Sequence, residues 1–245
     1  MMGVSRGGKI ITEDLIFCID AASKRSYSSG TGWSDLVLGN DGLLLNGAAF
    51  SSDIGGCINF DGTDERVNFA TSESVGTSDF TLEILWRRNI EETGRNMGVY
   101  VGHPYAVKSL SGFVLWSGAG GGVTLYCYPG DGSSQGVTSP TGDSSIFTID
   151  FLNNWTHTIV TVKRSTSSGS DNLWYINGIK YTNRITNVPK VDPSWDLAYE
   201  NGYPKLGDWP FGDLNGQIAL VRIYKKHFSE EEALQNYNST RGRFE

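Results

Sequence analysis

The acidic residues within strand-like segments are the first candidates for chemistry, because two carboxylates facing one cleft can hydrolyse a glycosidic bond. Side chains at alternate positions of a strand share a face. Glu83 lies in such a segment, but Leu85 and Arg87 occupy the next two positions on its face. Glu91 and Glu92 are adjacent, so their side chains diverge in an extended chain. The sequence therefore predicts no hydrolytic carboxylate pair, and we expect no catalytic residues and no enzyme activity.

The histidines give no sign of a catalytic group. They are His103, His157 and His227, which are far apart in sequence, and the chain has no G-x-S-x-G and no H-E-x-x-H motif. We expect His157 to be a structural histidine with satisfied hydrogen bonds inside a strand.

The three cysteines are expected in the core rather than in bridges or metal sites. Cys18, Cys57 and Cys127 each have apolar neighbours, their number is odd, and no C-x-x-C spacing occurs. We therefore expect three buried, reduced thiols that form no disulfide.

A segment rich in aromatic residues, 193–211 within a loop from about residue 188 to 212, is the candidate binding surface for a partner or a glycan. Its aromatic side chains are Trp195, Tyr199, Tyr203, Trp209 and Phe211. Aromatic rings beside polar groups are a common way to hold sugars or partner proteins. The alternative is that a long loop folds onto the body of the protein and needs a small core of its own.

The elements that must position these residues are short strands separated by turns. The chain has 245 residues, 31 of them glycine, and no Pro-rich, Ser-rich or charged linker divides it. Strands are expected near 15–19, 43–50, 56–61, 65–69, 80–88, 112–116, 123–128, 155–164, 172–182 and 214–224, with loops at 26–40, 129–145 and 188–212. Asn177-Gly178 suits a tight hairpin turn. The absence of β-α alternation predicts an all-β fold of two antiparallel sheets.

The C-terminal part carries the clearest local signals. Residues 214–224 are apolar on both parities, which predicts a strand buried on both faces in the middle of a two-sheet sandwich. Ser229 and Glu232 have the spacing of a capping box, which predicts one short helix to about residue 238.

Several motifs resemble the laminin G-like, concanavalin A-like lectin and glucanase jelly-roll family. The matching stretches are F-D-G-T-D at 60–64, F-T-L-E-I-L-W at 80–86, N-W-T-H-T-I-V-T-V at 154–162, L-W-Y-I-N-G at 173–178, L-N-G-Q-I at 214–218, V-R-I-Y at 221–224 and S-E-E-E at 229–232. The resemblance implies a two-sheet antiparallel jelly-roll sandwich over residues 15–245, with one short C-terminal helix. Glucanases on this fold carry E-x-D-x-E on one strand, and no such triplet occurs here.

Calcium is the ion that this resemblance implies, because some laminin G-like domains bind it through loop carboxylates and carbonyls. The candidate ligands are Asp61, Asp64, Asp208 and Asp213. The alternative, which we favour, is that these aspartates form turns between strands. We expect no other cofactor.

Residues 10–36 resemble the opening of virion structural proteins of tailed phages. The matching stretches are I-I-T-E-D-L-I-F-C-I-D-A-A-S-K-R-S-Y at 10–27 and T-G-W-S-D-L at 31–36. The resemblance implies a non-enzymatic virion structural protein, either a head decoration or fibre or a tail component. Its partners would be other virion proteins and copies of itself. The alternatives are a carbohydrate-binding module for host attachment, which would bind cell-surface glycan, and a divergent glycosidase.

The N-terminal segment and the charge bear on location and partners. Residues 1–9 lack the apolar core of a signal peptide, so we expect synthesis in the bacterial host cytoplasm and a final location in the virion. The net charge of −7 disfavours nucleic acid and an anionic membrane surface. Residues 1–14 are mostly polar, with Ile10 and Ile11 as a small apolar anchor. We expect this arm to contact other copies or other virion proteins rather than its own core.

Overall fold

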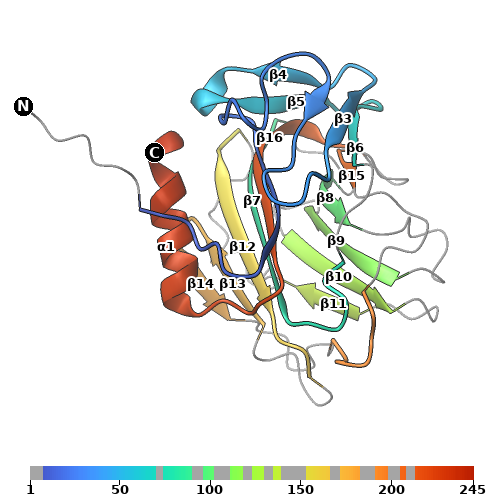
Figure 1. The fold of residues 1–245 in the computed structure, drawn as a ribbon, viewed down its shortest axis with the longest axis vertical. Coiled ribbons are helices and arrows are strands. Elements are labelled where there is room, and N and C mark those ends of the chain that lie inside the picture. Colours follow the sequence, from blue (N-terminus) through green and yellow to red (C-terminus); the bar gives the residue numbers. More distant parts are fainter. Residues whose placement is uncertain are drawn as a thin grey trace, which may run out of the picture.

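The computed structural model describes residues 8–69, 74–89, 96–101, 111–117, 123–129, 135–138, 153–165, 172–182, 191–197, 205–207 and 213–245. In this part of the chain two eight-stranded sheets pack face to face (Figure 1). Every strand pair is antiparallel. The predicted all-β, two-sheet antiparallel sandwich is therefore confirmed.

The first sheet runs in the order β14-β13-β12-β7-β16-β5-β4, and β1 also pairs with β16. Its strands are β1 (Leu15–Asp20), β4 (Ala49–Ser51), β5 (Cys57–Asp61), β7 (Phe80–Arg88), β12 (Thr156–Val162), β13 (Leu173–Ile176), β14 (Ile179–Thr182) and β16 (Asn215–Tyr224). The second sheet runs β11-β10-β9-β8-β15-β6-β3-β2. Its strands are β2 (Gly32–Trp33), β3 (Gly42–Leu45), β6 (Arg66–Phe69), β8 (Asn96–Val101), β9 (Ser111–Ser117), β10 (Val123–Pro129), β11 (Gln135–Thr138) and β15 (Lys205–Leu206).

The central strand β16 is buried from Gly216 to Tyr224, as its apolar residues on both parities predict. β7 lies along one side of it, and β5 and then β1 lie along the other. The register with β7 shifts between Ile218 and Leu220, which marks a bulge.

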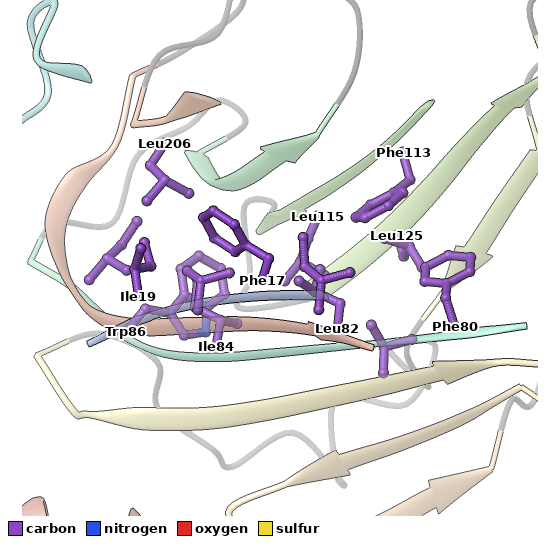
Figure 2. Close-up of a cluster of buried hydrophobic side chains, with 14 of the residues drawn as sticks. Phe17, Ile19, Phe80, Leu82, Ile84, Trp86, Phe113, Leu115, Leu125 and Leu206 are labelled. Atoms are coloured by element: carbon purple, nitrogen blue, oxygen red, sulfur yellow. The ribbon is translucent and has the colours of Figure 1, made fainter. Parts of the chain in front are cut away.

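The core lies between the two sheets (Figure 2). β7 alternates, so that Phe80, Leu82, Ile84 and Trp86 point into it. Side chains that meet them from the second sheet include Phe113, Leu115, Leu125 and Leu206. Burial of this many large apolar side chains is the main favourable contribution to folding.

One helix, α1 (Glu230–Thr240), covers the outer face of the first sheet beside β12, β13 and β14 (Figure 1). The Ser229 hydroxyl accepts a hydrogen bond from Glu232 N, and the Glu232 carboxylate accepts one from Ser229 N. The predicted capping box is therefore confirmed. Two short 3-10 turns, η1 (Asp53–Gly55) and η2 (Arg241–Arg243), complete the helical elements of the described residues. No helix in this part of the chain is long and apolar enough to cross a membrane.

The hairpin predicted at Asn177-Gly178 joins β13 to β14. Both residues have positive φ, 49° and 75°. A Cβ on residue 178 would lie 2.5 Å from the ring of Tyr237 on α1. Glycine is therefore required here both by the turn and by the close approach of the helix.

The structure corrects the sequence-based boundaries in five places. The segment 43–50, predicted as one strand, is divided at Asn46 and Gly47, whose φ values are 57° and 107°, so β3 and β4 join different sheets. β2, β11 and β15 lie within the predicted loops 26–40, 129–145 and 188–212, and β8 lies where no strand was predicted. These short strands exist because neighbouring strands pair with them, which local composition does not reveal.

Candidate functional site

Glu83 lies on the face of β7 that α1 covers, and donors from three elements meet its carboxylate. Arg222 Nη1 donates to Oε1 at 2.6 Å, and His157 Nε2 lies 2.8 Å from the same oxygen. Asn236 Nδ2 donates to Oε2 at 2.7 Å, and the Tyr224 hydroxyl lies 3.4 Å from it. The cluster thereby joins β7 to β12, to β16 and to α1.

The charges in this cluster are strongly coupled. Burial by itself raises the pKa of Glu83, but Arg222 and His157 outweigh burial and hold that pKa at about 2. Burial acts to lower the pKa of Arg222, but the Glu83 charge raises it above its ordinary value. Burial and the Glu83 charge together raise the pKa of Tyr224. Because an ionised carboxylate only accepts hydrogen bonds, His157 must carry a proton on Nε2.

This cluster is suited to holding the fold together and not to turnover. The exposed fraction of Glu83 is 0%, and that of His157 is 1%. A substrate in solution reaches neither side chain, and every oxygen of the carboxylate already has a donor. The structural role predicted for His157 is confirmed. The partners of Glu83 were missed by sequence reasoning, although Arg222 and His157 stand out as polar residues in apolar strands.

The first part of the aromatic segment is anchored to the sandwich by Arg164, which follows β12 and is 9% exposed. Its Nη2 donates to the Gly76 carbonyl at 2.7 Å and its Nε to the Ser78 carbonyl at 2.9 Å. Its Nη1 lies 3.4 Å from the carbonyl oxygens of both Asp192 and Trp195. One guanidinium thus ties the segment 191–197 to the turn before β7.

Further bonds hold both ends of the segment 191–197. Ser165 N donates to the Val191 carbonyl at 2.9 Å, and Leu197 N donates to the Gly76 carbonyl at 3.0 Å. Ser74 Oγ donates to the Leu197 carbonyl at 2.8 Å. The base of the aromatic segment is therefore fixed before its remaining aromatic residues are reached along the chain.

Among the predicted aromatic binding residues, the structure describes Trp195. Its side chain is half-buried and packs against the main core, which is the alternative considered from the sequence. Tyr199, Tyr203, Trp209 and Phe211 lie outside the described residues.

Two of the predicted calcium ligands, Asp61 and Asp64, lie at the connection between β5 and β6. Asp61 Oδ1 accepts from Thr63 N at 2.9 Å, and Asp64 Oδ2 accepts from Asn46 Nδ2 at 3.0 Å. Asp213 is half-buried just before β16, and Asp208 lies outside the described residues. Within the described ranges no three acidic, histidine or cysteine side chains gather as a metal site would require. The contacts of Asp61 and Asp64 are those of turn-forming residues.

The N-terminal arm differs from its prediction where the structure describes it, from residue 8. Ile11 N donates to Asn236 Oδ1 at 2.8 Å, and Gln235 Nε2 donates to the Lys9 carbonyl at 2.7 Å. The Ile11 side chain packs against the cluster beneath α1, while Ile10 is half-buried. This part of the arm binds its own helix because α1 presents amide side chains to its backbone.

The three cysteines are buried and free, as predicted. Burial raises the pKa of Cys18 and Cys57 to about 11 and that of Cys127 to about 12. Thiols with such pKa values are poor nucleophiles at neutral pH.

Comparison with known proteins places the fold in a class. No family model matches this chain, and no curated protein matches it. Among solved structures, it is similar to the Trypanosoma rangeli sialidase in complex with sialic acid, with a TM-score of 0.63 and 12% identity over 98% of this chain and 36% of that one. It is also similar to the binding domain of Paraclostridial Mosquitocidal Protein 1, with a TM-score of 0.65 and 17% identity over 92% of this chain and 52% of that one.

A third similar structure belongs to botulinum neurotoxin type C, whose cell entry depends on interaction with two ganglioside molecules. Its TM-score is 0.64, with 12% identity over 93% of this chain and 51% of that one. This chain thus spans about a third to a half of the structures it matches. At these identities the likeness shows the fold alone, a two-sheet β-sandwich.

Proposed function

We propose that this chain is a non-enzymatic binding module and that its ligand is cell-surface carbohydrate. The observation that carries the proposal is the anchoring of the aromatic segment by Arg164. A rigid framework that holds the base of an aromatic-rich loop is the usual construction of a binding surface. The aromatic and polar residues that follow along the chain suit the mixed apolar and hydroxyl surface of a sugar.

The state of Glu83 supports a binding role over hydrolysis. Glu83 is the acidic residue of β7. Its carboxylate accepts hydrogen bonds from Arg222, His157 and Asn236 inside the molecule. A general acid must have a raised pKa and reach the leaving group. The pKa of Glu83 is instead held at about 2. Glycosidase activity would therefore require catalytic carboxylates other than Glu83.

The similar structures support carbohydrate as the ligand class. One is a sialidase in complex with sialic acid, and another belongs to a toxin whose cell entry depends on two gangliosides. Sialic acid is a sugar, and a ganglioside is a glycolipid with an oligosaccharide head group.

The test is binding of the purified chain to a printed array of defined sialylated and neutral oligosaccharides, followed by calorimetry with the best ligand. We expect Tyr203→Ala and Trp209→Ala to weaken binding at least tenfold, while Tyr203→Phe and Trp209→Phe retain it. The same oligosaccharides should be recovered intact after incubation. Retention of no glycan by the wild-type chain, or release of cleaved sugar, would contradict the proposal.

A virion structural protein of a tailed phage is the second candidate function. It is favoured by the resemblance of residues 10–36 to the opening of such proteins. In the structure this opening forms β1 and the loop in which the buried Asp35 carboxylate accepts from the backbone of Cys18, Val37 and Leu38. Quantitative mass spectrometry of purified particles tests this candidate. We expect the protein at a fixed copy number per particle, and its absence from the particle would contradict the virion role. The two candidates are compatible, since a particle protein can bind host glycan.

A further inference from the structure

Phe50 is an exposed aromatic ring that is supported from behind by a second ring. Its exposed fraction is 40%, and it stacks on Tyr27 with the ring centroids 4.8 Å apart and the planes 5° from parallel. Tyr27 in turn packs against the main core, and its hydroxyl donates to the Gly30 carbonyl at 2.8 Å. Because Tyr27 covers one face of the Phe50 ring, the exposed area belongs to the opposite face and the ring edge.

The ring lies at an edge of the sandwich. β4, which carries Phe50, is the last strand of the first sheet (Figure 1). Phe50 pairs with Ile58 of β5, whose side chain is fully buried in the core, so the ring lies where the core reaches the edge. The outer side of an edge strand presents backbone donors and acceptors that no further strand of the sheet uses.

We propose that Phe50 is a stacking platform for one pyranose ring of a bound glycan, at a subsite built from residues other than those of the aromatic segment 193–211. A pyranose has an apolar face of C–H groups and a rim of hydroxyls. The open face of Phe50 suits the C–H groups of the sugar, and the backbone of the edge strand β4 suits its hydroxyls. The stack on Tyr27 holds the ring in place, so that little side-chain entropy is lost on binding. This inference rests on the proposed carbohydrate-binding function.

The size of the surface favours a sugar over a second copy of the chain or another protein. An aromatic side chain has about 150–250 Å² of surface, so at 40% exposure Phe50 offers roughly 60–100 Å². A stable protein interface buries about 800 Å² on each partner. Val37, Leu38 and Leu43 are the other exposed large apolar side chains near this end of the chain, and with them the total stays well below that area.

The first sheet offers a matched control at its other edge. Ile179 is 58% exposed on β14, the strand at the opposite end of the sheet order from β4. Substituting either residue by alanine removes an exposed apolar side chain from an edge strand. Only the Phe50 substitution removes an aromatic face.

The experiment measures affinity for the best oligosaccharide from the array in wild type, Phe50→Ala, Phe50→Trp and Ile179→Ala, with the melting temperature of each. We expect Phe50→Ala to lose at least tenfold in affinity, Phe50→Trp to retain or gain affinity, and Ile179→Ala to bind as wild type. Ring-proton signals of Phe50 should also shift during a titration with that oligosaccharide.

The outcomes separate this inference from the proposed function. If Phe50→Ala binds the oligosaccharide as well as wild type does, the Phe50 platform is wrong, but the carbohydrate-binding function is still supported. An equal loss in Ile179→Ala would likewise overturn the platform, because a general effect of edge substitutions would then explain it. If wild type binds no glycan, both the carbohydrate-binding function and the Phe50 platform are wrong.

Discussion

Arg222 Nη1 lies 2.6 Å from Glu83 Oε1 on the neighbouring strand, and the two residues are 6% and 0% exposed. This ion pair sits on the face of the first sheet that α1 covers, where water cannot screen it. Removing one partner of such a pair leaves the other charge uncompensated inside the molecule.

We therefore expect Glu83→Gln to destabilise the protein by about 3–5 kcal/mol. The amide keeps the shape of the side chain but no longer balances the Arg222 charge. Urea unfolding monitored by tryptophan fluorescence gives the change in unfolding free energy. Glu230→Gln is the matched control, because Glu230 pairs with Lys180 at 2.6 Å on the surface, and its midpoint should stay at the wild-type value. Equal stability of Glu83→Gln and wild type would contradict the account of the buried cluster.

The same pair predicts a pH dependence. The folded protein holds the pKa of Glu83 at about 2, below its ordinary value of 4.5. A lowered pKa means that the ionised group stabilises the fold fully above about pH 4.5 and that this stabilisation is lost as the pH falls toward 2. The difference in unfolding free energy between wild type and Glu83→Gln should thus be constant at neutral pH and shrink below pH 4.5. A difference that stays constant down to pH 2.5 would show that Glu83 is not the titrating group.

Gly178→Ala should weaken the contact between the β13–β14 hairpin and α1. Alanine at positive φ costs about 1–2 kcal/mol by itself. At position 178 the new Cβ would also lie 2.5 Å from the Tyr237 ring. Gly30→Ala isolates the backbone cost, since Gly30 has φ of 74° and nothing within 4 Å of its Cβ position. Thermal melts should show a larger loss for Gly178→Ala than for Gly30→Ala, and equal losses would refute the role assigned to Tyr237.

Two deletions divide the N-terminal arm. Removing residues 2–8 should leave the melting temperature unchanged, because among the described residues of the arm Lys9 and Ile11 make the bonds to α1. Removing residues 2–12 takes away those bonds and the packing of Ile11, and should lower the melting temperature by about 5 °C or more. If the longer deletion melts as wild type does, residues 2–12 do not stabilise the fold. That result would support the prediction that the arm contacts other proteins instead.

Local elements of this fold were predictable because their causes are local. Ser229 and Glu232 cap α1 with atoms three residues apart, and Asn177-Gly178 turns the chain through its own φ values. The alternation in β7 likewise follows from the period of a strand. The candidate site was less predictable: Trp195 could be named from composition, but its packing against the core could not.

The amino-acid sequence by itself determined the two-sheet class, the buried central strand, the capped helix and the buried thiols. The tertiary structure alone decided which polar residues meet. Glu83 contacts His157, Arg222 and Asn236, which are 74, 139 and 153 residues away in sequence. The ring of Phe50 likewise stacks on that of Tyr27, from an earlier part of the chain. Burial dictates that a buried carboxylate must have partners. Which partners it has depends on strand order, and β12-β7-β16 become neighbours only when distant segments pack together, because non-local strand pairing is set by the whole core.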